Sequence, residues 1–111
     1  MKRIILLAFL CTTTLVMAQR INHVQEAIAN YDYEAALTLI AKEKPTIPLL
    51  LQKGKAQRGL GMNTEALSTY QEIIANDTAN TRAYIEAAEC CRSLAKYQQA
   101  LKYYEPVSYT H

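Results

Sequence analysis

The chain has 111 residues, half of them apolar, and contains only three Gly and three Pro. A chain of this length forms one small helical domain or a few helical repeats, and its apolar content excludes an intrinsically disordered protein. Its net charge of +2 corresponds to Lys2 and Arg3, so the rest of the chain is formally neutral and lacks the positive field that nucleic-acid binding requires.

Residues 1–18 have the pattern of a cleaved signal peptide. Two basic residues precede an unbroken apolar run over residues 4–10, and Val16 and Ala18 are side chains that a signal peptidase accepts. We expect cleavage after Ala18. A membrane anchor is the alternative, but threonines interrupt the run well short of the roughly 20 apolar residues that span a bilayer. A lipid anchor on Cys11 is disfavoured by the bulky leucine before it.

The rest of the chain reads as a series of helices. Apolar side chains recur at helical spacing, as in Ile21, Val24 and Ile28, and no stretch alternates like a strand. Turn-forming residues separate the helical stretches, for example at 30–32, 59–61 and 76–78. The pattern predicts an all-α fold with helices near 21–29, 33–43, 48–59, 64–75, 81–94 and 97–104.

Two stretches, 47–80 and 81 onward, align position by position and indicate a repeat of about 34 residues. Equivalent positions pair Leu50 with Tyr84, Gly54 with Ala88, Leu60 with Leu94, Ala66 with Ala100, Leu67 with Leu101 and Tyr70 with Tyr104. The expected N-cap residues Thr46 and Asn80 repeat at the same distance. A partial earlier copy over residues 33–37 places Ala36 opposite Ala66 at a spacing four shorter, so the linker through Pro45 is shortened.

This period, with a large residue early, a small one four later and an Ala-Leu-x-x-Tyr cluster near the end, resembles the tetratricopeptide repeat. The resemblance implies a right-handed α-solenoid of antiparallel helix pairs. It divides the chain into a degenerate first repeat (19–46), a full repeat (47–80) and an incomplete one (81–106). It also implies a non-catalytic scaffold for protein interactions. The sequence departs from the family pattern at Ala88, which replaces a Gly, and at Thr78, where Pro is common.

Small residues recur where the two helices of a pair are expected to approach closely. Gly54, Ala66, Ala88 and Ala100 occupy these positions, and Ala66→Leu is expected to overpack the contact at a cost of roughly 1 to 3 kcal/mol. The large rings of Tyr70 and Tyr104 are expected to fill the gap toward the next pair.

The sequence offers little material for catalysis, and we expect no enzymatic activity, cofactor or metal. It has no phosphate-binding loop, paired metal-ligand motif or nucleophile elbow. His23 is interpreted as a surface or half-buried residue rather than a catalytic one. Cys90 and Cys91 are interpreted as buried packing residues rather than a redox or metal site, because neighbours on a helix point about 100 degrees apart.

The candidate site is the concave face, which in the family is lined by the first helix of each pair. The matching positions provide four cations, one acid and two apolar residues for an extended peptide with acidic groups. They are Leu51, Lys55, Arg58, Arg82, Ile85, Glu89 and Arg92. The asparagines with which some family members clamp a terminal carboxylate are missing, so that activity is not carried over. The alternative for each single charge is an ordinary solvated face.

The end of the chain and a short loop motif bear on its source and extent. Residues 77–79, Asp-Thr-Ala, resemble a glycosylation signal of exported Bacteroidota proteins, so we expect the periplasm or cell envelope of a Gram-negative bacterium. Residues 107–111 do not continue the repeat and are interpreted as an artefactual tail, with the native protein continuing beyond Glu105. An uncapped last repeat is expected to favour self-association.

Two other functions remain open from the sequence. One is the helical part of a glycan-binding outer-membrane subunit, for which Tyr31 and Tyr33 are the clustered aromatic residues. The other is an accessory repeat segment of a larger protein.

Overall fold

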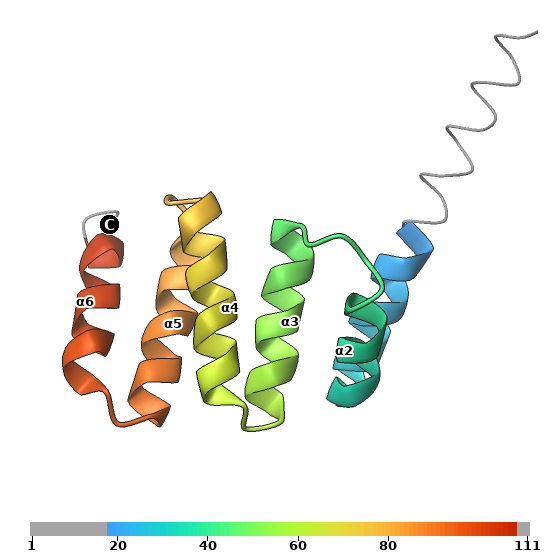
Figure 1. Ribbon diagram of the computed structural model, residues 1–111, viewed down its shortest axis with the longest axis horizontal. Helices are drawn as coiled ribbons and strands as arrows, with labels where there is room; N and C mark the ends of the chain where they lie inside the picture. Colours follow the sequence, from blue (N-terminus) through green and yellow to red (C-terminus); the bar gives the residue numbers. More distant parts are fainter. Residues whose placement is uncertain (1–17, 109–111) are drawn as a thin grey trace, which may run out of the picture.

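The computed structural model describes residues 18–108, and within this range it is all-helical, which confirms the all-α part of the predicted fold class (Figure 1). A helix at residues 18–29 is followed by α2 (Tyr33–Ile40), α3 (Ile47–Gly59), α4 (Asn63–Asn76), α5 (Thr81–Ser93) and α6 (Tyr97–Ser108). Consecutive helices from α2 to α6 pack against one another, and their connections alternate between the two ends of the row. The predicted signal-peptide core and the last three residues lie outside the described range.

Local capping explains where three of the helices begin. The side chains of Asp32, Thr46 and Asn80 accept hydrogen bonds from the backbone amides three residues later, over 3.2, 3.4 and 3.1 Å respectively. Such bonds satisfy amides that have no partner inside the helix. The predicted caps at Thr46 and Asn80 are therefore confirmed, and α4 begins without a side-chain cap.

The three turns that close the helix pairs share one backbone geometry. Tyr31, Gly61 and Ala95 have positive φ angles of 60°, 75° and 59°. In each turn this residue donates to the carbonyl three positions back, and the next residue donates to the carbonyl five positions back. This is the Schellman arrangement that ends many helices. The interval between the first two turns is four positions shorter than the next interval, so the repetition seen in the sequence has a counterpart in the turns.

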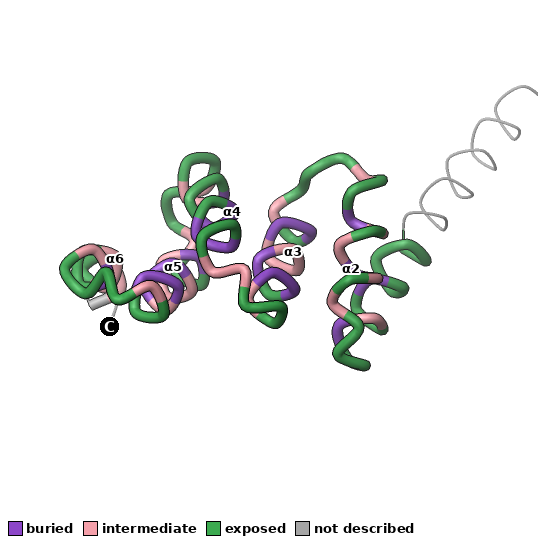
Figure 2. The backbone as a smooth tube through the Cα atoms, turned by 60° about the horizontal axis from the view of Figure 1, so that its bottom comes forward, coloured by how far each residue is buried: buried purple, intermediate pink, exposed green. Residues whose placement is uncertain are grey.

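The apolar core divides into two clusters at α3. The N-terminal cluster contains Val24, Ile28, Ala36, Ile40, Leu49 and Ala56. The C-terminal cluster is larger and contains Leu50, Ala66, Leu67, Tyr70, Ile73, Ala83, Ala87, Ala88, Cys90, Cys91 and Ala100. Leu49 belongs to the N-terminal cluster and its neighbour Leu50 to the C-terminal cluster, so α3 is buried on two sides. Figure 2 shows buried segments along α3, α4 and α5.

The predicted close contacts are present. Ala66, Ala88 and Ala100 are buried. A Cβ atom on Gly54 would lie 2.7 Å from Cε1 of Tyr70, so the Tyr70 ring packs directly on the bare backbone of α3. Tyr70 itself is buried, whereas Tyr104 is half-buried on α6.

Three helices differ from the prediction by three or more residues. The first is helical from residue 18, where the described range begins, rather than from residue 21. The second helix ends at Ile40 rather than at residue 43, and the chain leaves it through short turns in which Lys42 and Glu43 donate to carbonyls three positions back. Pro45 restricts the backbone of the residue before it, which opposes further helix. The last helix reaches Ser108 rather than residue 104 and includes Pro106. Proline has no backbone N–H, so Pro106 removes one hydrogen bond of the helix. That bond lies near the C-terminal end of α6, and the rest of the helix keeps its hydrogen bonds.

Candidate binding groove

A hollow of about 340 Å³ lies between α3 and α5, the first helices of two successive pairs. Four of the seven residues predicted for the concave face line it: Leu51, Lys55, Arg58 and Arg82. Gln52 and Glu86 complete its walls, and Tyr70 from α4 also lines it. Both α3 and α5 pack against α4, and this brings the predicted residues together. In the sequence, the whole of α4 separates Arg58 from Arg82.

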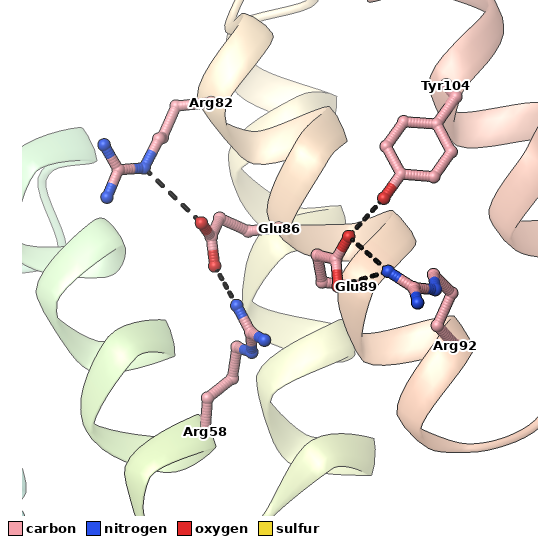
Figure 3. Close-up of polar contacts among 6 residues, drawn as sticks. All are labelled: Arg58, Arg82, Glu86, Glu89, Arg92 and Tyr104. Atoms are coloured by element: carbon pink, nitrogen blue, oxygen red, sulfur yellow. Dashed lines mark hydrogen bonds and ion pairs between the residues drawn. The ribbon is translucent and has the colours of Figure 1, made fainter.

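Glu86 links the two arginines of this hollow (Figure 3). Arg58 Nη1 donates to Glu86 Oε2, and Arg82 Nε lies 3.6 Å from Glu86 Oε1. The Glu86 side chain is 19% exposed, whereas that of Arg82 is 67% exposed. With Lys55 included, three cations face a single carboxylate, so the hollow carries a net positive charge.

Tyr70 contributes an uncharged ring to this hollow. Burial raises the pKa of its hydroxyl well above the ordinary value, because the phenolate would lose its hydration. The ring therefore stays neutral at physiological pH, and the charge of the hollow depends on its three cations and on Glu86.

The other three predicted residues do not line this hollow. Ile85 is half-buried on α5. Glu89 and Arg92 form a separate cluster with α6, in which Arg92 Nη1 lies 3.1 Å from both carboxylate oxygens of Glu89 and the Tyr104 hydroxyl donates to Glu89 Oε1 (Figure 3). The hydrogen bond from Tyr104, followed by that from Arg92, lowers the pKa of Glu89. The predicted face is thus divided into a cationic hollow and an internally neutralised cluster.

A second hollow, of about 320 Å³, adjoins the first along α3. Its lining includes Gln25, Ile28 and Ala29 from the helix at 18–29, Tyr31 and Tyr33 from the first turn and α2, and Gln52 and Lys55 from α3. Gln52 and Lys55 line both hollows, so the two adjoin at these side chains and together extend over three first helices. We call the two adjoining hollows together the groove.

The sequence reasoning missed three polar residues of the groove: Gln25, Gln52 and Glu86. Arg82 and Glu86 are four residues apart on one helix, a spacing that pairs opposite charges, and this signal could have identified Glu86. The contact of Glu86 with Arg58 could not have been found in this way, because it joins two helices. The glutamines carry no charge pattern that would have marked them.

A third hollow, of about 410 Å³, lies away from these cations. Its lining includes Leu37 and Ile40 from α2, Leu49 and Leu50 from α3, and Glu72 from α4. It lies beside the end of α2 at Ile40 and the turn that contains Glu43.

The residues considered for chemistry lie outside the groove. Cys90 and Cys91 are free thiols and fully buried, as the packing interpretation predicted. His23 is exposed beside Glu26 and Asp32. Within residues 18–108 no group of three or more His, Cys, Asp or Glu side chains is placed to hold a metal ion. None of the helices in that range is both long and apolar enough to cross a membrane.

No protein-family model matches the chain, and no curated protein matches it. Function is therefore inferred from the groove itself.

Proposed function

We propose that this protein is a tetratricopeptide-like scaffold that binds an extended, acidic segment of a partner protein in its groove. The observation that carries the proposal is the gathering of Lys55, Arg58 and Arg82 around one hollow with a single carboxylate, Glu86. In the cell envelope of a bacterium, where we propose that the signal peptide directs it, such a scaffold has no need of a catalytic group.

The repeated turns support a solenoid arrangement. Three Schellman turns with left-handed residues at 31, 61 and 95 close three successive helix pairs. Repeats that each contact only their neighbours stack into a superhelix with an extended inner surface. We propose the right-handed form found in the tetratricopeptide family, with the groove on its concave side.

The charge of the groove favours acidic ligands. Carboxylates accept charge-assisted hydrogen bonds from Arg and Lys, and Arg offers several donors in one plane. Glu86 already forms ion pairs with the guanidinium groups of Arg58 and Arg82. A ligand carboxylate would therefore share these guanidinium groups with Glu86 or displace it. Lys55 is exposed and borders both hollows, and no ion pair of Glu86 within residues 18–108 engages it, so it is the cation chosen to test binding of an acidic segment.

The aromatic residues of the groove favour a peptide over a glycan. A platform on which a sugar stacks across both rings needs the two rings to be coplanar. The rings of Tyr31 and Tyr33 are inclined at 76° to each other, with centroids 6.3 Å apart, so they form a corner rather than a shared platform.

Charge reversal at Lys55 tests the proposal. The probe is a fluorescein-labelled peptide of eight residues made of Asp, Gly and Ser, titrated with the purified protein and followed by fluorescence anisotropy at two salt concentrations. Lys55→Glu is expected to weaken binding about tenfold, because it replaces an attraction by a repulsion at the groove. Binding to the unaltered protein is also expected to weaken as salt rises.

Lys102→Glu is the matched control, since it makes the same change in net charge on an exposed position of α6. It is expected to leave the affinity unchanged. Absence of saturable binding, or equal losses in the two variants, would show that the groove does not recognise acidic segments.

A further inference from the structure

Tyr31 occupies a backbone conformation that opposes its side chain. Its φ of 60° lies in the left-handed region, where the Cβ atom of an L-residue crowds the following carbonyl oxygen. The equivalent positions in the other two turns hold Gly61 and Ala95. The ring of Tyr31 is 79% exposed, so burial does little to offset the unfavourable backbone. Within the described chain, the ring contact of this large aromatic residue is with Tyr33, at a centroid distance of 6.3 Å.

The surroundings of Tyr31 form a site with a fixed wall. A Cβ atom on Gly59 would lie 2.6 Å from Cδ2 of Tyr33, which means that the Tyr33 ring packs on the bare backbone at the end of α3. The rings of Tyr31 and Tyr33 form an edge-to-face pair, at a centroid distance of 6.3 Å. Ile28 and Ala29 add apolar surface to the same hollow, and Gln25 and Gln52 border it.

We propose that Tyr31 and Tyr33 form an aromatic subsite at one end of the groove, which takes an aromatic side chain of the bound acidic segment. The inference rests on the proposed function, because the subsite shares Gln52 and Lys55 with the cationic hollow. A ligand that fills both hollows carries its aromatic residue close to its acidic ones.

The two tyrosine rings and Lys55 favour an uncharged aromatic side chain of the ligand at this subsite. Aromatic rings prefer edge-to-face or offset contacts, and two touching rings inclined at 76° offer a face and an edge to a third ring that packs beside them. Lys55 lines the same hollow and repels a cationic side chain, which would otherwise be attracted to the ring faces. An apolar aromatic side chain satisfies both conditions.

The test uses Tyr31→Gly with two fluorescein-labelled peptides, an acidic one that contains a single Phe and the same peptide with Ala in its place. The unaltered protein is expected to bind the Phe peptide roughly tenfold more tightly than the Ala peptide. Tyr31→Gly is expected to abolish this preference and to raise the melting temperature, because glycine accepts the left-handed conformation. Tyr31→Phe retains the ring and is expected to retain the preference.

Ala95→Gly is the matched control. It relieves the same backbone conformation in a turn outside the groove, so it is expected to raise the melting temperature and to leave the preference intact. The subsite is refuted if both peptides bind the unaltered protein equally, or if Tyr31→Gly keeps the preference; in both cases acidic binding through Lys55 still stands. If neither peptide binds, the proposed function fails and the subsite with it.

Discussion

The junction between α4 and α5 is filled by large side chains, whereas the junction between α2 and α3 leaves a hollow of about 410 Å³. In the alignment of the first repeat with the second, Tyr70 and Ile73 of the filled junction correspond to Ile40 and Glu43 of the open one. Tyr70 and Ile73 are both fully buried, while Glu43 lies on a turn and pairs with Arg20 over 3.0 Å.

The difference in helix length explains the difference in packing. The second helix of the first pair has eight residues, whereas α4 has 14. The extra turns of α4 bring it into contact with α6, where Gln71 Nε2 donates to the Tyr103 hydroxyl over 2.9 Å. The comparison shows that the turn geometry is the same where equivalent turns are spaced 30 and 34 residues apart, while the packing between the helices differs.

The largest expected effect is the loss of the Tyr70 ring. Tyr70→Ala is expected to lower the free energy of unfolding by about 3 to 5 kcal/mol, because the ring is buried and its removal leaves a cavity against Gly54. Ile40→Ala, at the equivalent position beside the existing hollow, is expected to cost about 2 kcal/mol, the lower end for such truncations. Urea unfolding of both variants measures the two values. Equal losses would contradict the distinction between a filled and an open junction.

Alkaline pH is expected to weaken the filled junction through Cys90. Burial raises the pKa of this thiol from 9.0 to about 11, because the thiolate would lose its hydration. The unfolded chain releases the proton near pH 9 and the folded chain only near pH 11, so this contribution to stability is complete below pH 9 and is lost as pH rises toward 11.

Urea unfolding at pH 8 and pH 10.5 measures this dependence, with Cys90→Ala as the control that removes the thiol from the C-terminal cluster. The unaltered protein is expected to lose more stability between the two pH values than Cys90→Ala does. Identical losses would mean that the thiol is not buried in the folded state.

Substitutions in the turns are expected to cause the smallest changes in stability, and two of them are expected to have opposite signs. Gly61→Ala is expected to destabilise the protein by about 1 kcal/mol, since nothing surrounds the added Cβ atom and only the left-handed backbone opposes it. Ala95→Gly is expected to stabilise it by a few tenths of a kcal/mol up to about 1 kcal/mol, because the relief of the backbone exceeds the gain in chain entropy on unfolding. Thermal unfolding of the two variants gives both signs. Shifts in the same direction would show that the turns are not equivalent.

Much of the fold could be predicted because its signals are local. Helical spacing of apolar residues located all six helices within residues 18–108, and the capping side chains of Thr46 and Asn80 marked two of their starts. The end of α2 was missed by three residues, because the helical pattern continued past Ile40 and the effect of Pro45 on the preceding turn was underestimated.

The candidate site could be predicted only in part. The repeat period selected Leu51, Lys55, Arg58 and Arg82 as neighbours, because residues at equivalent repeat positions share a face. Which charges compensate one another depended on contacts between helices: Glu86 reaches Arg58 of α3, and Tyr104 of α6 reaches Glu89. Such pairs are set by the distance and rotation of packed helices, which no single stretch of sequence encodes.

Helix positions, caps and turns were thus determined by the amino-acid sequence, since each depends on a few neighbouring residues. The division of the core at α3, the joining of two hollows along Gln52 and Lys55, and the exposed ring at Tyr31 were decided by tertiary packing. The physical reason is that burial and charge pairing act between segments far apart in the chain, and their outcome changes when one helix is shortened by a turn.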